Sequence, residues 1–331
     1  MQGHHLLGQP GSGAPVVSFS GSAHYLRVFA LFSFAVACTL LGNGLSTLSF
    51  APLYTSEKTT PAILLVVGGL IAAPVLLVLR LSAFEFNGPR TRLMSIGAFL
   101  SVPLLVGGAA ASAVHWMKQL SDRDGAYVYD GPAIIYFVSF ILRDMLLATS
   151  ALALPILAGI YGFKHVEEVE GRRPPAAMIE ECALTQGKRF VCGVLSFNFA
   201  TGMFLTTTGV TALVANLSDT ANFKAFALFT YSGFAIGGIV MLATNSYGSR
   251  LLVKVDQRGL PRLRILLAVS AVALCLALVV ILANYLTQLH DLSDGSFERK
   301  FALGYRIQTA FTCMTIIVGA VLHVLAIKKV Q

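Results

Sequence analysis

The chain has 331 residues, of which 56% are apolar and only 12% are charged, and its mean hydropathy is +0.74. A soluble domain carries about 25% charged residues, so this chain could not cover its surface with polar groups in water. The composition therefore excludes a soluble globular enzyme, a disordered protein and a small disulfide-stapled secreted domain, and it indicates a multi-pass membrane protein.

Eight apolar stretches are long enough to cross the hydrocarbon core of a bilayer, which takes roughly 20 helical residues. Lipid offers no hydrogen-bond partners to backbone amides, so each stretch is predicted to be a helix. The predicted fold class is all-α, with eight transmembrane helices at about 26–50, 61–84, 93–117, 132–163, 190–216, 222–247, 262–288 and 306–327.

The charges predict the orientation of these helices. The formal net charge is +8, but the basic residues lie in short segments between apolar stretches, which does not indicate a nucleic-acid partner. Sixteen basic residues lie in the segments on the same side as the two termini, and seven lie in the segments on the opposite side. By the positive-inside rule, both termini are expected on the cytoplasmic or equivalent inner side. Residues 1–24 are then a mobile inner tail.

The second half of the chain repeats polar motifs of the first half. PRTRL at 89–93 precedes the third stretch and PRLRI at 261–265 precedes the seventh; KQLSD at 118–122 follows the third and TQLHD at 287–291 follows the seventh. Matches in loops are harder to obtain by chance than matches between apolar helices. The sequence predicts two tandem four-helix repeats, at 25–163 and 190–331. An even number of spans gives both repeats the same orientation, and residues 164–189 form a charged inner-side linker.

Polar side chains recur on the first helix of each repeat. With an offset of 165 residues, Asn43 aligns with Thr208 and Ser46 with Thr211, and Asn198 lies earlier on the fifth helix. These residues are candidates for lining a pathway between the repeats. The alternative is that they bond neighbouring helices, a contribution of about 0.6 kcal/mol on average in membranes.

Arg143 and Asp144 are the only adjacent charged residues well inside a predicted span. Charged residues in hydrocarbon are costly and often functional. Adjacent helix positions point about 100° apart, so each side chain is expected to need another partner or solvent. The alternative places the pair at the membrane interface, because the stretch at 132–163 is longer than a bilayer requires.

Small residues spaced by four allow close helix packing. Gly68 and Ala72 have this spacing on the second stretch, and Gly233 and Gly237 have it on the sixth, where the offset of 165 aligns the two pairs. We expect them to pack helices within the bundle. The alternative is a face directed toward a second chain.

The sequence contains no P-loop, no H-E-x-x-H and no nucleophile elbow. Histidine and cysteine spacings typical of a metal or haem site are also missing. We therefore predict no enzyme activity, no catalytic residue, no metal and no cofactor. The favoured function is a small-solute transporter or channel with a path between two pseudo-symmetric repeats. The alternative is a non-catalytic structural or accessory subunit, a membrane organiser, of a larger membrane complex. The expected partners are the lipid bilayer and either other membrane subunits or a second copy of the chain.

Overall fold

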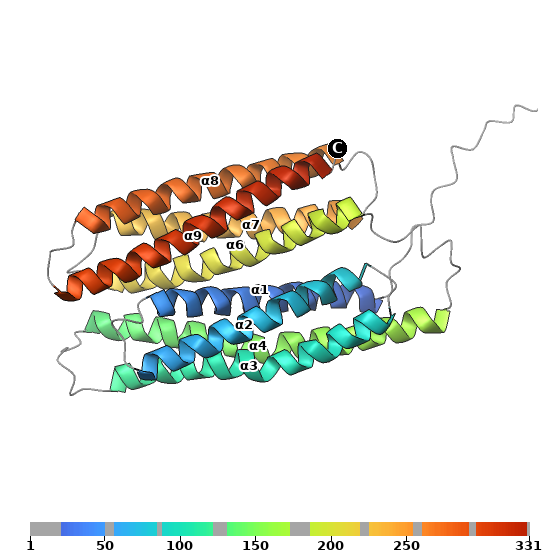
Figure 1. The fold of residues 1–331 in the computed structure, drawn as a ribbon, viewed down its shortest axis with the longest axis horizontal. Helices are drawn as coiled ribbons and strands as arrows, with labels where there is room; N and C mark the ends of the chain where they lie inside the picture. Colours follow the sequence, from blue (N-terminus) through green and yellow to red (C-terminus); the bar gives the residue numbers. More distant parts are fainter. Residues whose placement is uncertain are drawn as a thin grey trace, which may run out of the picture.

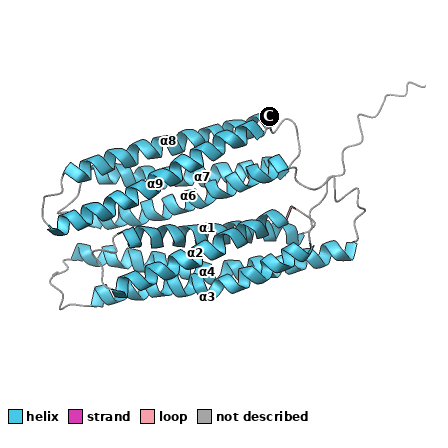
Figure 2. Cartoon of the chain, in the orientation of Figure 1, coloured by secondary structure: helices cyan, strands magenta, loops and turns pink. Residues whose placement is uncertain are grey.

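The computed structural model describes residues 21–49, 56–84, 88–121, 131–172, 186–218, 225–253, 260–290 and 296–329. Within these ranges the chain is helical except for a turn at Ala83 and Phe84, and no strand occurs among them (Figure 2). The all-α class is confirmed. The helices are α1 (Gly21–Ser49), α2 (Ser56–Ser82), α3 (Gly88–Ser121), α4 (Gly131–Arg172), α6 (Gln186–Ser218), α7 (Ala225–Val253), α8 (Leu260–His290) and α9 (Ser296–Lys329).

All eight of these helices are long and apolar enough to cross a membrane, as the hydropathy pattern predicts. Their backbone groups are paired inside each helix, which is the arrangement that a chain can adopt in lipid. Many large apolar side chains on α8 and α9 are exposed on the outside of the bundle, among them Ile265, Leu276 and Met314. Exposed apolar side chains of this kind are what a lipid-facing surface requires.

The helices form two halves that lie side by side (Figure 1). In the first half, α1 packs on α2 and α4, and α3 packs on α2 and α4. In the second half, α6 packs on α7 and α9, and α8 packs on α7 and α9. The halves meet chiefly where α6 packs against α1 and α4, with a smaller contact between α1 and α9. The first helix of each half therefore lies at the centre of the bundle.

The apolar core continues from one half into the other. The largest buried cluster is built on α1 to α4 and includes Phe199 and Ala200 of α6. A second cluster joins Phe84, in the turn after α2, to apolar residues of α6, α8 and α9. Because each half contributes side chains to the core of the other, the junction is an apolar contact as well as a polar one.

Helix α4 continues beyond the position where the charged linker was predicted to begin. Its last turns are held to the first half: Ser22 donates a hydrogen bond of 2.8 Å to Glu168, and Arg92 forms an ion pair of 2.7 Å with Glu170. His165 and Val166 are buried. The segment from Lys164 to Arg172 thus belongs to α4. The rest of the predicted linker up to residue 185, and residues 1–20 of the predicted tail, lie outside the described residues.

Candidate functional site

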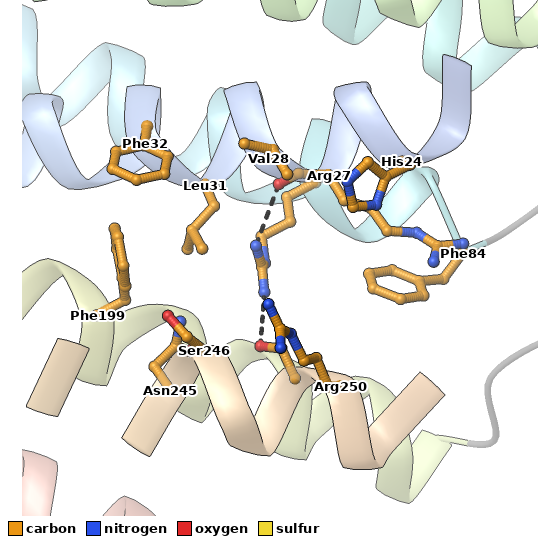
Figure 3. A pocket seen from close by; sticks show the side chains of 12 residues that line it. His24, Arg27, Val28, Leu31, Phe32, Phe84, Phe199, Asn245, Ser246 and Arg250 are labelled. Carbon is orange, nitrogen blue, oxygen red and sulfur yellow. Dashed lines mark hydrogen bonds between the residues drawn. The ribbon is translucent and has the colours of Figure 1, made fainter. Parts of the chain in front are cut away.

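A cavity of about 420 Å³ lies between the two halves, at the end of the bundle where α1 begins and where α2 and α7 end. Figure 3 shows α1 on one side of it and α6 and α7 on the other. Ligand sites in proteins have volumes of about 300–1,000 Å³, so the space suits a small molecule or a headgroup. The lining residues are His24, Arg27, Val28, Leu31, Phe32, Arg80, Phe84, Phe199, Asn245, Ser246, Ser249 and Arg250.

Three arginines bring positive charge to this cavity. Arg27 lies in the second turn of α1, while Arg80 and Arg250 lie in the last turns of α2 and α7. All three therefore reach the same end of the bundle. Among the described lining residues none is acidic. The cavity is consequently an electropositive space with partly apolar walls.

Arg80 connects the two halves. Its side chain is nearly inaccessible, with 3% exposed. One terminal nitrogen donates to the carbonyl oxygen of Arg27 at 3.2 Å, and the other donates to the hydroxyl of Ser249 at 3.2 Å (Figure 3). The Nε atom has no hydrogen-bond partner among the described residues. Both acceptors are neutral, so the guanidinium charge is solvated only by dipoles.

Arg27 is anchored on the turn that follows α2. Its guanidinium donates to the carbonyl oxygen of Ala83 at 3.3 Å and lies 4.2 Å from the centroid of the Phe84 ring. A cation over a ring face is attracted by the negative face of the π-system, by about 0.5–2 kcal/mol depending on exposure. These contacts hold the Arg27 side chain at the edge of the cavity.

Asn245 is the most unusual polar residue of the cavity. It is fully buried, and neither its amide nitrogen nor its amide oxygen has a hydrogen-bond partner among the described residues. A buried polar group left unpaired costs about 1–3 kcal/mol. Asn245 is among the residues that surround the cavity, so the unpaired amide belongs to its wall although the side chain is not itself exposed.

A buried polar cluster lies next to Asn245. Asn198 on α6 donates through its amide nitrogen to the hydroxyls of Thr244 and Ser270, at 3.3 Å each. These three residues come from α6, α7 and α8, so the cluster joins three helices of the second half. Asn198, predicted as a pathway residue, does not line the cavity and instead bonds neighbouring helices.

The other predicted pathway residues lie farther along α1 and α6, away from the cavity lining. Ser46 accepts a hydrogen bond of 2.6 Å from Gln308 of α9, which is a bond between the two halves. Asn43 and Thr208 are half-buried and Thr211 is buried. The structure thus separates the polar stripe from the cavity.

Arg143 and Asp144 bond to each other, which the sequence did not predict, and each also has the further partner that was expected. The Asp144 carboxylate is 2.7 Å from an Arg143 terminal nitrogen and accepts a second bond of 2.6 Å from Ser112 of α3. The Arg143 guanidinium also lies 4.8 Å from the centroid of the Phe140 ring. The long arginine side chain bends back along α4, so the direction of its Cβ does not limit its reach. Neither residue lines the cavity.

The predicted packing glycines differ between the halves. A Cβ on Gly68 would lie 3.2 Å from the Leu104 backbone of α3, and Ala72 is fully buried. Among the described residues, no atom lies within 4 Å of a Cβ built on Gly233 or Gly237. The prediction that these two residues pack helices within the chain is therefore wrong for the described part of the structure, because no described helix covers this face of α7 at those positions.

The close approach of α6 and α7 uses other glycines. A Cβ on Gly209 would lie 2.8 Å from the Tyr231 carbonyl oxygen, and one on Gly238 would lie 2.6 Å from the Gly202 carbonyl oxygen. Sequence reasoning missed Gly238 although it is adjacent to Gly237. It also missed Asn245, whose signal was an amide inside an apolar span, and it interpreted the cavity arginines only as orientation signals.

No group of three or more His, Cys, Asp or Glu residues in the described ranges is arranged to hold a metal ion. No protein-family model, curated protein or solved structure matches the chain. The cavity, with its arginines and its unpaired amide, is thus interpreted from its own geometry.

Proposed function

We propose that the chain is a membrane transporter or channel for a small anionic solute, which moves along the junction between the two halves without being chemically converted. The observation that supports this best is the cavity between the halves, where arginines and an unpaired buried amide come together. In transporters built from repeats, the solute site lies between the repeats. Both termini lie on the inner side in this proposal, and the cavity opens there.

The proposed duplication is supported by equivalent contacts in the two halves. The carbonyl oxygen of Ala62 lies 2.9 Å from a Cβ built on Gly44, and that of Tyr231 lies 2.8 Å from one built on Gly209. In the second pair, a Cβ built on Gly69 lies 2.9 Å from the Ala37 carbonyl oxygen, and one built on Gly238 lies 2.6 Å from the Gly202 carbonyl oxygen. Each glycine thus meets its neighbouring helix at the corresponding place.

The junction is closed beyond the cavity by aromatic side chains. The rings of Phe32 and Phe199 meet edge to face, with centroids 5.0 Å apart. Farther along, the ring of Phe204 lies against Gly42, 2.8 Å from the position of a Cβ. Bonds between the halves lie on either side of this closure: Arg80 with Ser249, and Gln308 with Ser46. A rocking motion of the halves would break one bond while the other is kept, which is what alternating access requires.

Cysteine labelling tests this proposal without knowledge of the solute. Ser246→Cys places a thiol in the cavity lining, and Gly171→Cys places one at the exposed end of α4. Both are made in a chain whose five native cysteines are replaced by serine. A membrane-impermeant maleimide is applied to sealed vesicles of each orientation. Alternating access predicts labelling of Ser246→Cys from both sides and of Gly171→Cys from the inner side only. If the thiols of Ser246→Cys and Gly171→Cys are each labelled from one side only, transport is contradicted.

The open face of α7 favours a second candidate, a non-catalytic accessory subunit of a membrane complex. Gly233 and Gly237 face no described helix of their own chain, and Ile236 and Val240 beside them are exposed. Small residues on an exposed apolar face allow a helix of another subunit, or of a second copy, to approach closely. In this case Gly237→Leu should reduce the size of the native complex while the isolated chain stays folded. An unchanged complex would show that this face meets lipid.

A further inference from the structure

We propose that the cavity binds the phosphate group of an amphipathic ligand, with Arg80, Arg250 and Asn245 contacting the phosphate and the aromatic wall contacting the apolar part. This inference rests on the proposed function, because it names the class of molecule that the same cavity takes. The phosphate can belong to a soluble organic phosphate or to a phospholipid headgroup.

The charge of the cavity favours an anion. Arg80 and Arg250 form no ion pair within the described part of the chain, and no acidic side chain is among the described lining residues. Removing a cation from water costs several kcal/mol unless an opposite charge compensates it. Arg80 is buried, so an anion in the cavity would offset much of this cost.

The donor geometry favours phosphate over a carboxylate. Guanidinium groups form paired, charge-assisted hydrogen bonds with phosphate oxygens. The Nε atom of Arg80 is unbonded among the described residues, and Arg250 is exposed at the rim of the cavity with no hydrogen bond to the described part of the chain. A phosphate presents three or more oxygens, enough for two arginines that approach from α2 and α7.

Asn245 adds a neutral donor and an acceptor on the same side. Its amide nitrogen can donate to a third phosphate oxygen, and its amide oxygen can accept from a hydroxyl of the ligand. Natural proteins rarely leave such a group buried and unpaired. Its presence among the residues that surround the cavity is an independent indication of a ligand with polar atoms.

The remaining wall is apolar and indicates the rest of the ligand. Leu31, Phe199 and Phe84 are buried, whereas Phe32 is 40% exposed at the rim. Phe32 lies on α1, a candidate membrane-spanning helix, so an acyl chain or an aromatic group could leave the cavity beside it. Basic pockets between transmembrane helices commonly hold anionic lipid headgroups.

The experiment uses the purified full chain in a nonionic detergent. Phospholipid retained through purification is measured as phosphorus per mole of protein. After delipidation, binding of phenyl phosphate is measured by isothermal titration calorimetry, with benzoate as the singly charged, phosphate-free comparison. Arg250→Gln and Asn245→Leu remove cavity groups, and Arg262→Gln removes an exposed arginine of α8 that does not line the cavity.

Arg250→Gln is expected to weaken phenyl phosphate binding at least about tenfold, as for loss of one charged hydrogen bond, and Arg262→Gln should leave it unchanged. Asn245→Leu should weaken binding while thermal stability is kept or raised, because the unpaired amide is removed. If phospholipid is retained in stoichiometric amount and is lost in Arg250→Gln, the phosphate belongs to a phospholipid headgroup. If phenyl phosphate binds but no phospholipid is retained, the phosphate belongs to a soluble organic phosphate.

Equal affinity for benzoate, equal effects of Arg250→Gln and Arg262→Gln, or absence of both bound phospholipid and phenyl phosphate binding would overturn the inference. None of these results depends on labelling from two sides. Binding without alternating access would refute transport alone, and alternating access without phosphate binding would refute this inference alone.

Discussion

Two adjacent glycines on α7 provide a sharp test of the packing between α6 and α7. Gly238 faces α6, where a Cβ would lie 2.6 Å from both the Gly202 carbonyl oxygen and the Thr206 amide nitrogen. A Cβ on Gly237 would meet no atom of the described residues within 4 Å. We therefore expect Gly238→Ala to destabilise the protein and Gly237→Ala to be neutral or stabilising.

The magnitude follows from comparing the two variants with each other. Both gain the same helix propensity, about 1 kcal/mol, so their difference isolates the clash. Real Cβ atoms essentially never lie within 3.0 Å of such atoms. A Cβ on Gly238 would meet the Thr206 hydroxyl, which can rotate, but also two backbone atoms of α6, which cannot. Inserting a methyl group into a packed site costs about 1–3 kcal/mol. Gly238→Ala should therefore be less stable than Gly237→Ala by about 1–3 kcal/mol.

The assay is thermal unfolding of both variants in the same detergent. Unfolding is monitored as the fraction of protein that remains monodisperse on size-exclusion chromatography after heating. Gly238→Ala should lose this fraction at a lower temperature than the unsubstituted protein. If Gly237→Ala is destabilised as much as Gly238→Ala, the register of α7 on α6 described above is wrong by one residue.

Two further stability predictions follow from the polar contacts. Asp144→Leu leaves the Arg143 guanidinium without its carboxylate and should lower the free energy of unfolding by about 3–5 kcal/mol. Glu170→Gln, at the exposed ion pair with Arg92, should lower it by less than about 1 kcal/mol; similar losses in chemical denaturation would contradict the buried position of Asp144. Asn198→Leu removes the amide nitrogen that donates to both Thr244 and Ser270, whose hydroxyls also bond to each other. The change should cost about 0.6–1.7 kcal/mol, with no change in phenyl phosphate affinity, because Asn198 lies outside the cavity lining.

The eight helices could be predicted from the sequence because length and hydropathy alone decide whether a segment can cross a bilayer. The end of α4 could not. The sequence predicts residues 164–172 as the start of a charged, partly helical linker, but Glu168 and Glu170 have partners on α1 and α3. Such contacts depend on which helices become neighbours, and hydropathy along one segment does not contain that information.

The cavity shows the same limit. The charge pattern predicts that Arg27, Arg80 and Arg250 share one end of the bundle. It does not predict that α1, α2 and α7 meet around one space, because that depends on the packing of the two halves. Asn245 was equally hard to select, since an isolated amide in an apolar span more often bonds a neighbouring helix, as Asn198 does.

The misaligned glycines have a different cause. An offset of 165 fits α1 and α6, where Gly44 corresponds to Gly209, but the contacts of α2 and α7 correspond with an offset of 169, which pairs Gly69 with Gly238. A shift of four residues turns a helix by only about 40°, so the apolar faces still coincide and the sequence alone cannot separate the two alignments.

The corrected offset pairs Gly68 with Gly237, and this pair reveals where the two halves differ. A Cβ on Gly68 would lie 3.2 Å from the Leu104 backbone, so α2 and α3 approach closely there. Gly237 has no such neighbour among the described residues. A small residue on an uncovered helix face is suited to close contact with another helix. We therefore expect a further subunit to pack on the second half, and Gly237→Leu tests that contact without disturbing the glycines that hold α6 to α7.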